Sequence, residues 1–168
     1  MMIEIREERA QDIGRIGAVT ERAFRDAPHS SHTEPLIVDA LRAAGKLTLS
    51  LVAVDGDQIV GHLALSPVSL SSGETGWQGL GPISVQPDRQ GRGIGTRLMQ
   101  AALQWLRISG AAGCVVLGDP RYYTRFGFSV FPQLVLPGVP PEYFMALPFS
   151  GKVPQADVAY DAAFEATP

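Results

Sequence analysis

Two hydrophobic periodicities run through the chain, and together they predict a mixture of helices and strands. Apolar residues recur every three or four positions in three segments, which predicts amphipathic helices over 11–24, 34–44 and 94–110. Alternation of apolar and polar residues, or a short apolar run, predicts strands over 3–6, 47–54, 59–70, 75–85, 114–117 and 128–131, with two more near 144–147 and 158–160. The Asp55-Gly56 pair predicts a hairpin turn, because glycine accepts a positive φ.

This order of elements predicts a mixed fold of the α+β or α/β class, in one domain over 1–168. The expected architecture is a mostly antiparallel central sheet of six to seven strands, flanked by helices. Glycines and Pro82 interrupt the strand at 75–85, which should therefore be bulged or open toward one neighbour. Residues 132–168 are rich in proline and should form a less regular C-terminal part after the core at 1–131.

Composition and charge narrow the classes of function. The chain is 45% hydrophobic and 18% charged, as in ordinary globular proteins. Its net charge of -3 argues against a general nucleic-acid binder. It has neither a long apolar run nor a basic segment followed by an apolar one at the start, so no membrane contact and no signal peptide are expected. The single cysteine, Cys114, cannot form an internal disulfide, which favours a cytoplasmic location.

The clearest chemical signal is a glycine-rich segment, Gln90-Gly91-Arg92-Gly93-Ile94-Gly95-Thr96, between an expected strand and an expected helix. Its glycines leave backbone N–H groups accessible at a helix N-terminus, where the macrodipole is positive. Such a concave group of backbone N–H donors, called a nest, suits phosphate. Positive charge nearby comes from Arg89, Arg92 and Arg97. The spacing matches neither a Walker loop nor the G-x-G-x-x-G dinucleotide loop. A tight turn without a ligand is the alternative.

Gln90-x-x-Gly93-x-Gly95, which follows a strand and opens an amphipathic helix, resembles the pyrophosphate loop of the GNAT acyltransferase superfamily. Downstream, Tyr123-x-x-x-Gly127-Phe128 is similar to the family's Tyr-x-x-x-Gly-Phe segment. The runs at 80–85 and 117–123 resemble one bacterial branch of N-acetyltransferases. The resemblance covers about 2–131 and is poor over the proline-rich remainder.

The resemblance implies acetyl-CoA as the acyl donor, with no metal, and a sheet that is splayed at the strand before the loop. It assigns the pyrophosphate to the loop residues Gln90, Gly91, Arg92, Gly93, Ile94, Gly95 and Thr96. It places the pantetheine arm beside the preceding strand, at Ile83, Ser84 and Val85. The interrupted strand agrees with this, because a splayed edge leaves backbone groups free for a ligand.

The resemblance also makes Tyr123 the general acid that protonates the departing thiolate. A phenol with a pKa near 10 is protonated at neutral pH, and it can donate a hydrogen bond to developing negative charge. The neighbouring Tyr122 is expected to pack in the core. Asp119 is expected to cap the N-terminus of a short helix that begins at Pro120.

The general base stays open, because no carboxylate occurs between Glu74 and Asp88 on the strand before the loop. The candidates are Glu34, His32 and a water molecule. No metal site is expected, because no third ligand clusters with the histidines at 29 and 32. Cys114 lies in an apolar segment and is expected to be an inert core thiol.

The sequence therefore predicts an acyl-CoA-dependent N-acyltransferase in which an amine attacks the thioester directly in a ternary complex. A non-catalytic CoA-binding or regulatory module is the alternative, favoured by the missing strand carboxylate and opposed by Tyr123. A different phosphate-binding protein is a third possibility. It is opposed by the glycine spacing, which matches neither the Walker loop nor the dinucleotide loop. The acceptor is the amine of a small molecule or of a protein. The sequence does not fix the oligomeric state, and a homodimer stays open.

Overall fold

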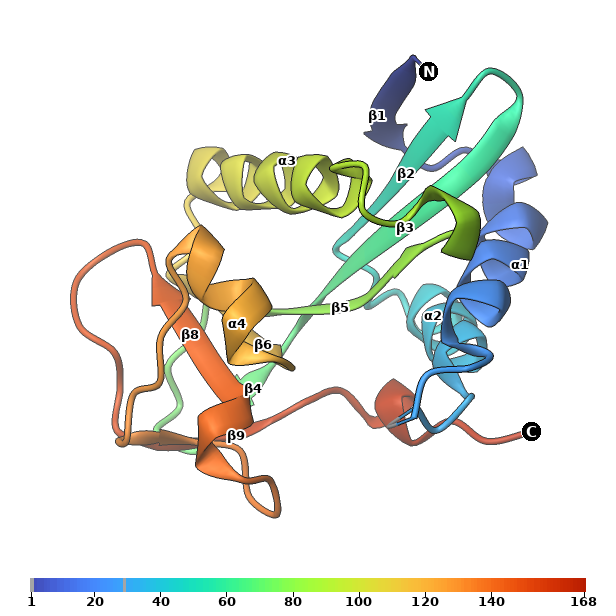
Figure 1. Cartoon of the computed structure of the whole chain (residues 1–168). Helices are drawn as coiled ribbons and strands as arrows, with labels where there is room; N and C mark the ends of the chain where they lie inside the picture. Colours follow the sequence, from blue (N-terminus) through green and yellow to red (C-terminus); the bar gives the residue numbers. More distant parts are fainter. Residues whose placement is uncertain (1, 29) are drawn as a thin grey trace.

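The computed structural model describes residues 2–28 and 30–168. Its main sheet has six strands in the order β1-β2-β3-β5-β6-β8 (Figure 1). These strands are β1 (Ile3–Glu7), β2 (Leu49–Asp55), β3 (Gln58–Pro67), β5 (Trp77–Val85), β6 (Gly113–Leu117) and β8 (Phe144–Pro148). Neighbouring strands pair antiparallel, except that β5 and β6 are parallel. The prediction of a mixed, mostly antiparallel central sheet of six to seven strands is confirmed, with six strands in the main sheet.

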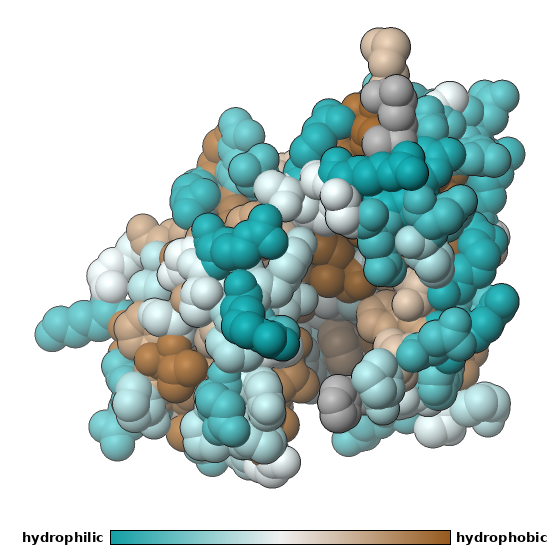
Figure 2. Space-filling model, viewed as in Figure 1, coloured by the Kyte–Doolittle hydropathy of each residue, from teal (hydrophilic) through white to brown (hydrophobic). Residues whose placement is uncertain are grey.

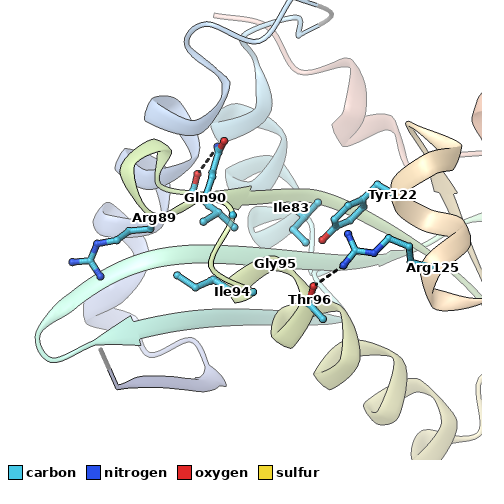
Figure 3. Close-up of a pocket in the computed structure, with 11 residues that line it drawn as sticks. Ile83, Arg89, Gln90, Ile94, Gly95, Thr96, Tyr122 and Arg125 are labelled. Atoms are coloured by element: carbon cyan, nitrogen blue, oxygen red, sulfur yellow. Dashed lines mark hydrogen bonds between the residues drawn. The ribbon is translucent and has the colours of Figure 1, made fainter.

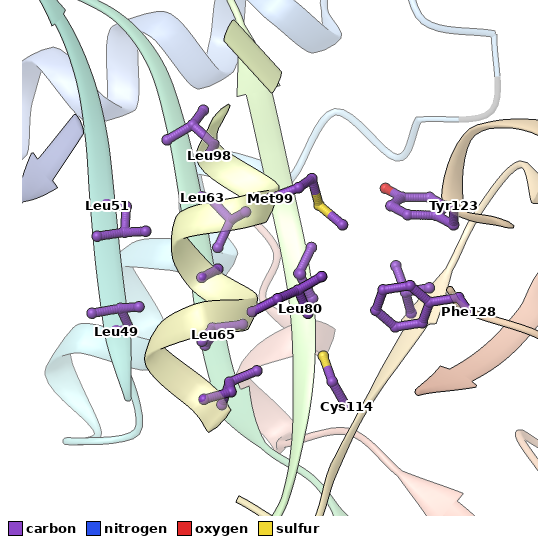
Figure 4. Close-up of a cluster of buried hydrophobic side chains, with 14 of the residues drawn as sticks. Leu49, Leu51, Leu63, Leu65, Leu80, Leu98, Met99, Cys114, Tyr123 and Phe128 are labelled. Carbon is purple, nitrogen blue, oxygen red and sulfur yellow. The ribbon is translucent and has the colours of Figure 1, made fainter. Parts of the chain in front are cut away.

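Helices cover both faces of this sheet (Figure 1). The α-helices are α1 (Ile13–Phe24), α2 (Glu34–Ala43), α3 (Ile94–Ser109) and the single turn α4 (Pro120–Tyr123). Short 3-10 helices are η1 (Ala10–Asp12), η2 (Pro87–Arg89), η3 (Thr124–Phe126), η4 (Pro141–Tyr143) and η5 (Ala162–Glu165). Because side chains alternate along a strand, Leu49 and Leu51 of β2 pack with α3, and Val52 and Val54 pack with α1 and α2. Figure 4 shows Leu98 and Met99 of α3 in the larger of these two cores.

The proline-rich C-terminal part folds against the rest of the chain. It supplies β8 to the main sheet, and a second sheet has the order β4-β9-β7. The strands of that sheet are β4 (Ser69–Leu70), β9 (Ala156–Ala159) and β7 (Leu134–Val135). The last 3-10 helix, η5, packs on α2, where Ala163 meets Ile37 and Leu41. The strands expected near 144–147 and 158–160 therefore correspond to β8 and β9.

Two expected strands differ from the structure, each at a proline. The segment 128–131 is not a strand, and only Ser129 forms an isolated bridge, to Ala146 of β8. The segment 59–70 is divided, because β3 ends at Pro67 and β4 joins the second sheet. Pro67 and Pro132 have no N–H group, so neither can donate to a strand ladder.

The strand before the glycine loop opens on one side. Its first residues, 77–80, pair with 113–116 of β6, and the register ends there. Residues 83–85 still pair with β3, after a register shift at Gly81 and Pro82. The expected bulge and splay are confirmed. The second half of β5 therefore has a neighbour on one side and a free backbone edge on the other.

A polar network is buried on the face of the sheet that α1 and α2 cover. His62 of β3 is fully buried, and its Nε2 lies 2.7 Å from the Ser50 hydroxyl of β2. The Ser50 hydroxyl donates a short hydrogen bond to Glu8. Glu8 in turn forms an ion pair with Arg42 of α2, at 2.8 Å. The chain of contacts thus links the N-terminal segment, two central strands and α2.

Replacing Gly113 with alanine is expected to lower the free energy of unfolding by about 1–3 kcal/mol, because it overpacks the paired end of β5 and β6. A Cβ atom at this position would lie 2.4 to 2.8 Å from three ring atoms of Trp77, whose side chain is almost fully buried. Urea denaturation measures the change. Gly17→Ala in α1 is the matched control, because its Cβ would have no atom within 4 Å. It should stabilise the helix by about 0.5–1 kcal/mol. Equal effects of the two substitutions would contradict the Trp77 contact as the cause.

Candidate active site

The glycine loop forms a backbone nest at the start of α3. Gly91 and Gly93 have φ values of 76° and 82°, a left-handed backbone conformation that residues other than glycine rarely adopt. Gly93 is the N-cap of α3, so the first N–H groups of the helix have no carbonyl of a preceding turn to bond. The loop is tied to β5 by Gln90, whose side-chain amide donates to the Val85 carbonyl at 3.1 Å. The nest expected from the glycine spacing is present and suits an anion.

A cavity of about 520 Å³ lies between this nest, the free edge of β5 and the segment that contains α4 and η3. Figure 2 shows a hollow over β5 with hydrophobic residues at its floor, and Figure 3 shows the lining side chains. The cavity is lined by Ile83, Val85, Arg89, Gln90, Gly91, Gly93, Ile94, Gly95, Thr96, Tyr122 and Arg125. The structure thus brings most of the predicted donor-binding residues to one place.

Two predicted donor-binding residues do not line the cavity. Ser84 is buried on the opposite face of β5, where its hydroxyl lies 3.5 Å from that of Thr20 in α1. This follows from strand alternation, because its neighbours Ile83 and Val85 face the cavity. Its backbone pairs with His62 of β3, so the backbone groups at the free edge are those of Ile83 and Val85. Arg92 is an exposed loop residue.

Tyr123 lies in the core beside the cavity. Asp119 caps α4 as expected, since its carboxylate accepts the Arg121 N–H at 2.9 Å. Tyr123 is 9% exposed and packs against Phe128 with 6.1 Å between ring centroids (Figure 4). Its ring fills the space next to Gly118, where a Cβ would lie 2.5 Å from Cε2. Burial raises the pKa of Tyr123, and its hydroxyl makes no hydrogen bond to the residues that the structure describes.

Tyr122 and Arg125 are the lining residues that the sequence did not assign. Tyr122 packs on the rings of Tyr123 and Phe126, as expected, but it also faces the cavity. Arg125 comes from η3, more than 25 residues after the loop along the chain. Its place in the segment between Tyr123 and Gly127 is the signal by which it could have been found.

Two other arginines near the loop, Arg89 and Arg97, have partners. Arg89 forms an ion pair with Asp55 at 2.5 Å, and Arg97 donates to the Ile3 carbonyl at 2.6 Å. Their charges therefore contribute to the field around the nest, but their side chains are also held by the hairpin end of β2 and by β1. The loop sits in a positively charged surrounding, as the sequence predicts.

The proposed bases lie away from the cavity. The Glu34 carboxylate accepts from the Ser30 hydroxyl at 2.8 Å, and His32 is exposed with a positive φ of 60°. Neither lines the cavity, and His29 lies outside the described residues. Burial raises the pKa of Cys114, in agreement with an unreactive core thiol.

Two kinds of feature are absent from the described residues. Within 2–28 and 30–168, no three His, Cys, Asp or Glu residues gather where they could hold a metal ion. No helix in this part of the chain has both the length and the apolar character needed to cross a bilayer.

The nest at the start of α3 opens directly onto the free edge of β5, and Tyr123 stands at the far side of the splay. This layout defines the class of acyl-CoA-dependent acyltransferases. The family model described as an acetyltransferase (GNAT) domain matches residues 47–130, which include β5, the loop and Tyr123. The chain belongs to the GNAT acetyltransferase family.

Similar proteins cover most of the chain. The uncharacterized N-acetyltransferase YhbS of Escherichia coli K12 is 38% identical over 127 residues, which are 75% of this chain and 73% of YhbS. The crystal structure of a GNAT family acetyltransferase from Brucella melitensis, in complex with acetyl-CoA, is 52% identical with a TM-score of 0.88. The alignment covers 97% of this chain and 98% of that one. The structure of E. coli YhbS in complex with CoA also has a TM-score of 0.88, at 32% identity. That alignment covers 98% of this chain and 92% of the YhbS chain.

Proposed function

We propose that this protein transfers an acetyl group from acetyl-CoA to an amine by direct attack in a ternary complex. The observation that carries the proposal is the cavity, which joins a phosphate-type nest to an unpaired strand edge. The pyrophosphate would bind the N–H groups of 91–96, and the pantetheine arm would lie along Ile83, Ser84 and Val85. The Brucella melitensis relative in complex with acetyl-CoA and the YhbS structure in complex with CoA support this donor.

In the proposed reaction, the amine nitrogen forms a bond to the acetyl carbon and the carbon–sulfur bond breaks. The backbone N–H near Val85 polarises the thioester carbonyl and stabilises the oxyanion that develops. The thiolate that leaves accepts a hydrogen bond from Tyr123 and then its proton. Burial raises the pKa of Tyr123, so its hydroxyl is protonated when the thiolate develops. Positioning of the two substrates supplies most of the rate.

The proton of the attacking amine goes to water in this proposal. Glu34 is hydrogen-bonded by Ser30, and His32 is exposed on the loop between α1 and α2. Neither of them lines the cavity; Tyr123 does not line it either, but it packs against the lining residue Tyr122, with 5.0 Å between ring centroids. A carboxylate is also missing from β5 itself, whose nine residues contain no Asp or Glu.

GNAT acetyltransferases act on amine acceptors, and we propose that the acceptor here is the amine of a small molecule or of a protein. The whole of 1–168 would form one acyltransferase domain, because β8 of the C-terminal part completes the main sheet. The net charge of -3 and the single cysteine favour a cytoplasmic protein that binds no nucleic acid. A homodimer is an arrangement to be tested by sedimentation.

Calorimetric titration with acetyl-CoA tests the donor site, with desulfo-CoA and ATP as comparison ligands. We expect saturable micromolar binding of acetyl-CoA and desulfo-CoA and no binding of ATP. A screen of amines, in which release of the CoA thiol is monitored, then distinguishes an enzyme from a binding module that retains the loop. A well-folded sample that binds no CoA species would overturn the proposal. Binding without thiol release for any amine would favour the binding module.

A further inference from the structure

Arg125 projects from η3 into the donor cavity (Figure 3). Its guanidinium carbon lies 5.2 Å from the ring centroid of Tyr122 and 5.6 Å from that of Phe126. One of its nitrogens donates to the Thr96 hydroxyl, in the first turn of α3, at 3.4 Å. Among the described residues, no carboxylate forms an ion pair with Arg125. Arg125 is thus held by two aromatic rings beside the N-terminus of α3. It faces the cavity, and no carboxylate of the described residues neutralises its charge there.

Gly95 shows that this segment is packed directly on the nest. Unlike Gly91 and Gly93, Gly95 does not have a left-handed φ, so its backbone conformation does not require glycine. A Cβ at this position would lie 2.9 Å from the Tyr122 hydroxyl. The third glycine of the loop therefore makes room for Tyr122. The first turn of α3 and the ring that supports Arg125 are in contact across the cavity.

We propose that Arg125 binds the pyrophosphate of the donor as a charged side-chain ligand, held in place by Tyr122 and Phe126. This inference rests on the proposed function. Backbone N–H groups alone are neutral donors, whereas a guanidinium adds a full charge and a fork that matches phosphate oxygens. Stacking on two aromatic rings restricts the side chain before the ligand arrives, so less conformational freedom is lost on binding. The contact with Thr96 places the charge beside the nest.

The 3′-phosphate of CoA has the same chemistry as the pyrophosphate, and a ligand pair separates the two. CoA carries both groups, and 3′-dephospho-CoA carries the pyrophosphate alone. Calorimetry with the full-length wild-type protein and with Arg125→Gln compares their affinities. We expect Arg125→Gln to weaken binding of both ligands equally, by about ten- to hundred-fold, which is the range for a hydrogen bond to a charged group. Arg125→Lys keeps the charge and loses the forked guanidinium, so its affinities should lie between those of the wild-type protein and Arg125→Gln.

Arg121→Gln is the matched control. Arg121 lies in α4, four residues before Arg125, but its side chain is 91% exposed and pairs with Asp119. Arg121→Gln changes the net charge by the same amount as Arg125→Gln, and it should leave the affinities for CoA and 3′-dephospho-CoA unchanged. A loss confined to CoA would overturn the proposal by moving Arg125 to the 3′-phosphate, and equal losses in the two glutamine variants would overturn it as a general charge effect. Unchanged affinity in Arg125→Gln would overturn this inference alone, whereas no binding by the wild-type protein would overturn the proposed function as well.

Discussion

Tyr123→Phe is expected to lower kcat by about 10²–10⁴-fold, the contribution typical of a positioned general acid. The substitution removes only the hydroxyl of a side chain that is 9% exposed and packs on Tyr122, which lines the cavity. The affinity for acetyl-CoA should stay within about two-fold, because Tyr123 does not line the donor cavity. Thiol release with an amine found in the screen measures kcat, and calorimetry measures the affinity.

The phenylalanine ring should preserve the fold around it. It keeps the contact with Phe128 and fills the same space beside Gly118. Tyr143→Phe is the control, because Tyr143 is 45% exposed on η4 and does not line the donor cavity. Full activity in Tyr123→Phe would remove this residue from the acid role. A loss of affinity as large as the loss of kcat would make Tyr123 a binding residue.

The second large effect is a loss of stability in acid that originates at His62. The Ser50 hydroxyl has one proton and donates it to Glu8, so Ser50 accepts from Nε2 of His62. Nδ1 of His62 lies in the interior without a partner among the described residues, so a second proton there would have no acceptor. Burial, opposed in part by Glu8, lowers the pKa of His62 from 6.5 to about 4. The unfolded chain therefore takes up a proton at a pH where the folded chain does not.

This difference in proton uptake has a definite sign. The contribution of His62 is fully present above pH 6.5 and is lost as the pH falls toward 4. The difference between a pKa of 6.5 in the unfolded chain and about 4 in the folded one corresponds to about 3 kcal/mol over the whole window. About 2 kcal/mol of it should be lost by pH 5, because each pH unit below 6.5 costs about 1.4 kcal/mol.

Urea denaturation of the wild-type protein and of His62→Gln, at pH 7.5 and at pH 5, measures this contribution. Glutamine can still donate to Ser50 but does not titrate. The variant should lose about 2 kcal/mol less than the wild-type protein between the two pH values. His32→Gln is the control, because His32 is exposed and its loss should leave the pH dependence unchanged. Parallel pH dependence in wild type and His62→Gln would show that another group causes the acid sensitivity.

The features that the sequence predicts well are set by neighbouring residues. Gly45 ends α2 with a φ of 70°, and Asp119 caps α4 through the next turn of the chain. The nest at 90–96 depends in the same way on glycines two residues apart at the start of a helix. The splay follows from Gly81 and Pro82, which interrupt β5 at the point where pairing with β6 ends. Local backbone rules are enough to place these features.

The features that the sequence does not predict depend on contacts between distant segments. Tyr122 and Tyr123 are neighbours on one turn, so only the packing of that turn on α3 decides which of them faces the cavity. The Glu8 and Ser50 pair is 42 residues apart in the chain, and its connection to His62 requires the pairing of β2 with β3. Neither arrangement has a local pattern, because each follows from the way in which complete elements pack.

The pairing of β6 has a consequence for how such a site can diversify. One side of β6 meets β5 only as far as Val116, and the other side pairs with β8 over all five of its residues. The position of β6 is therefore held from the C-terminal part, which lies beyond the residues that match the family model. Changes in 144–148 can shift the outer wall of the splay without altering the loop at 90–96. The wall of the splay that β6 and β8 form can thus change while the loop side stays constant.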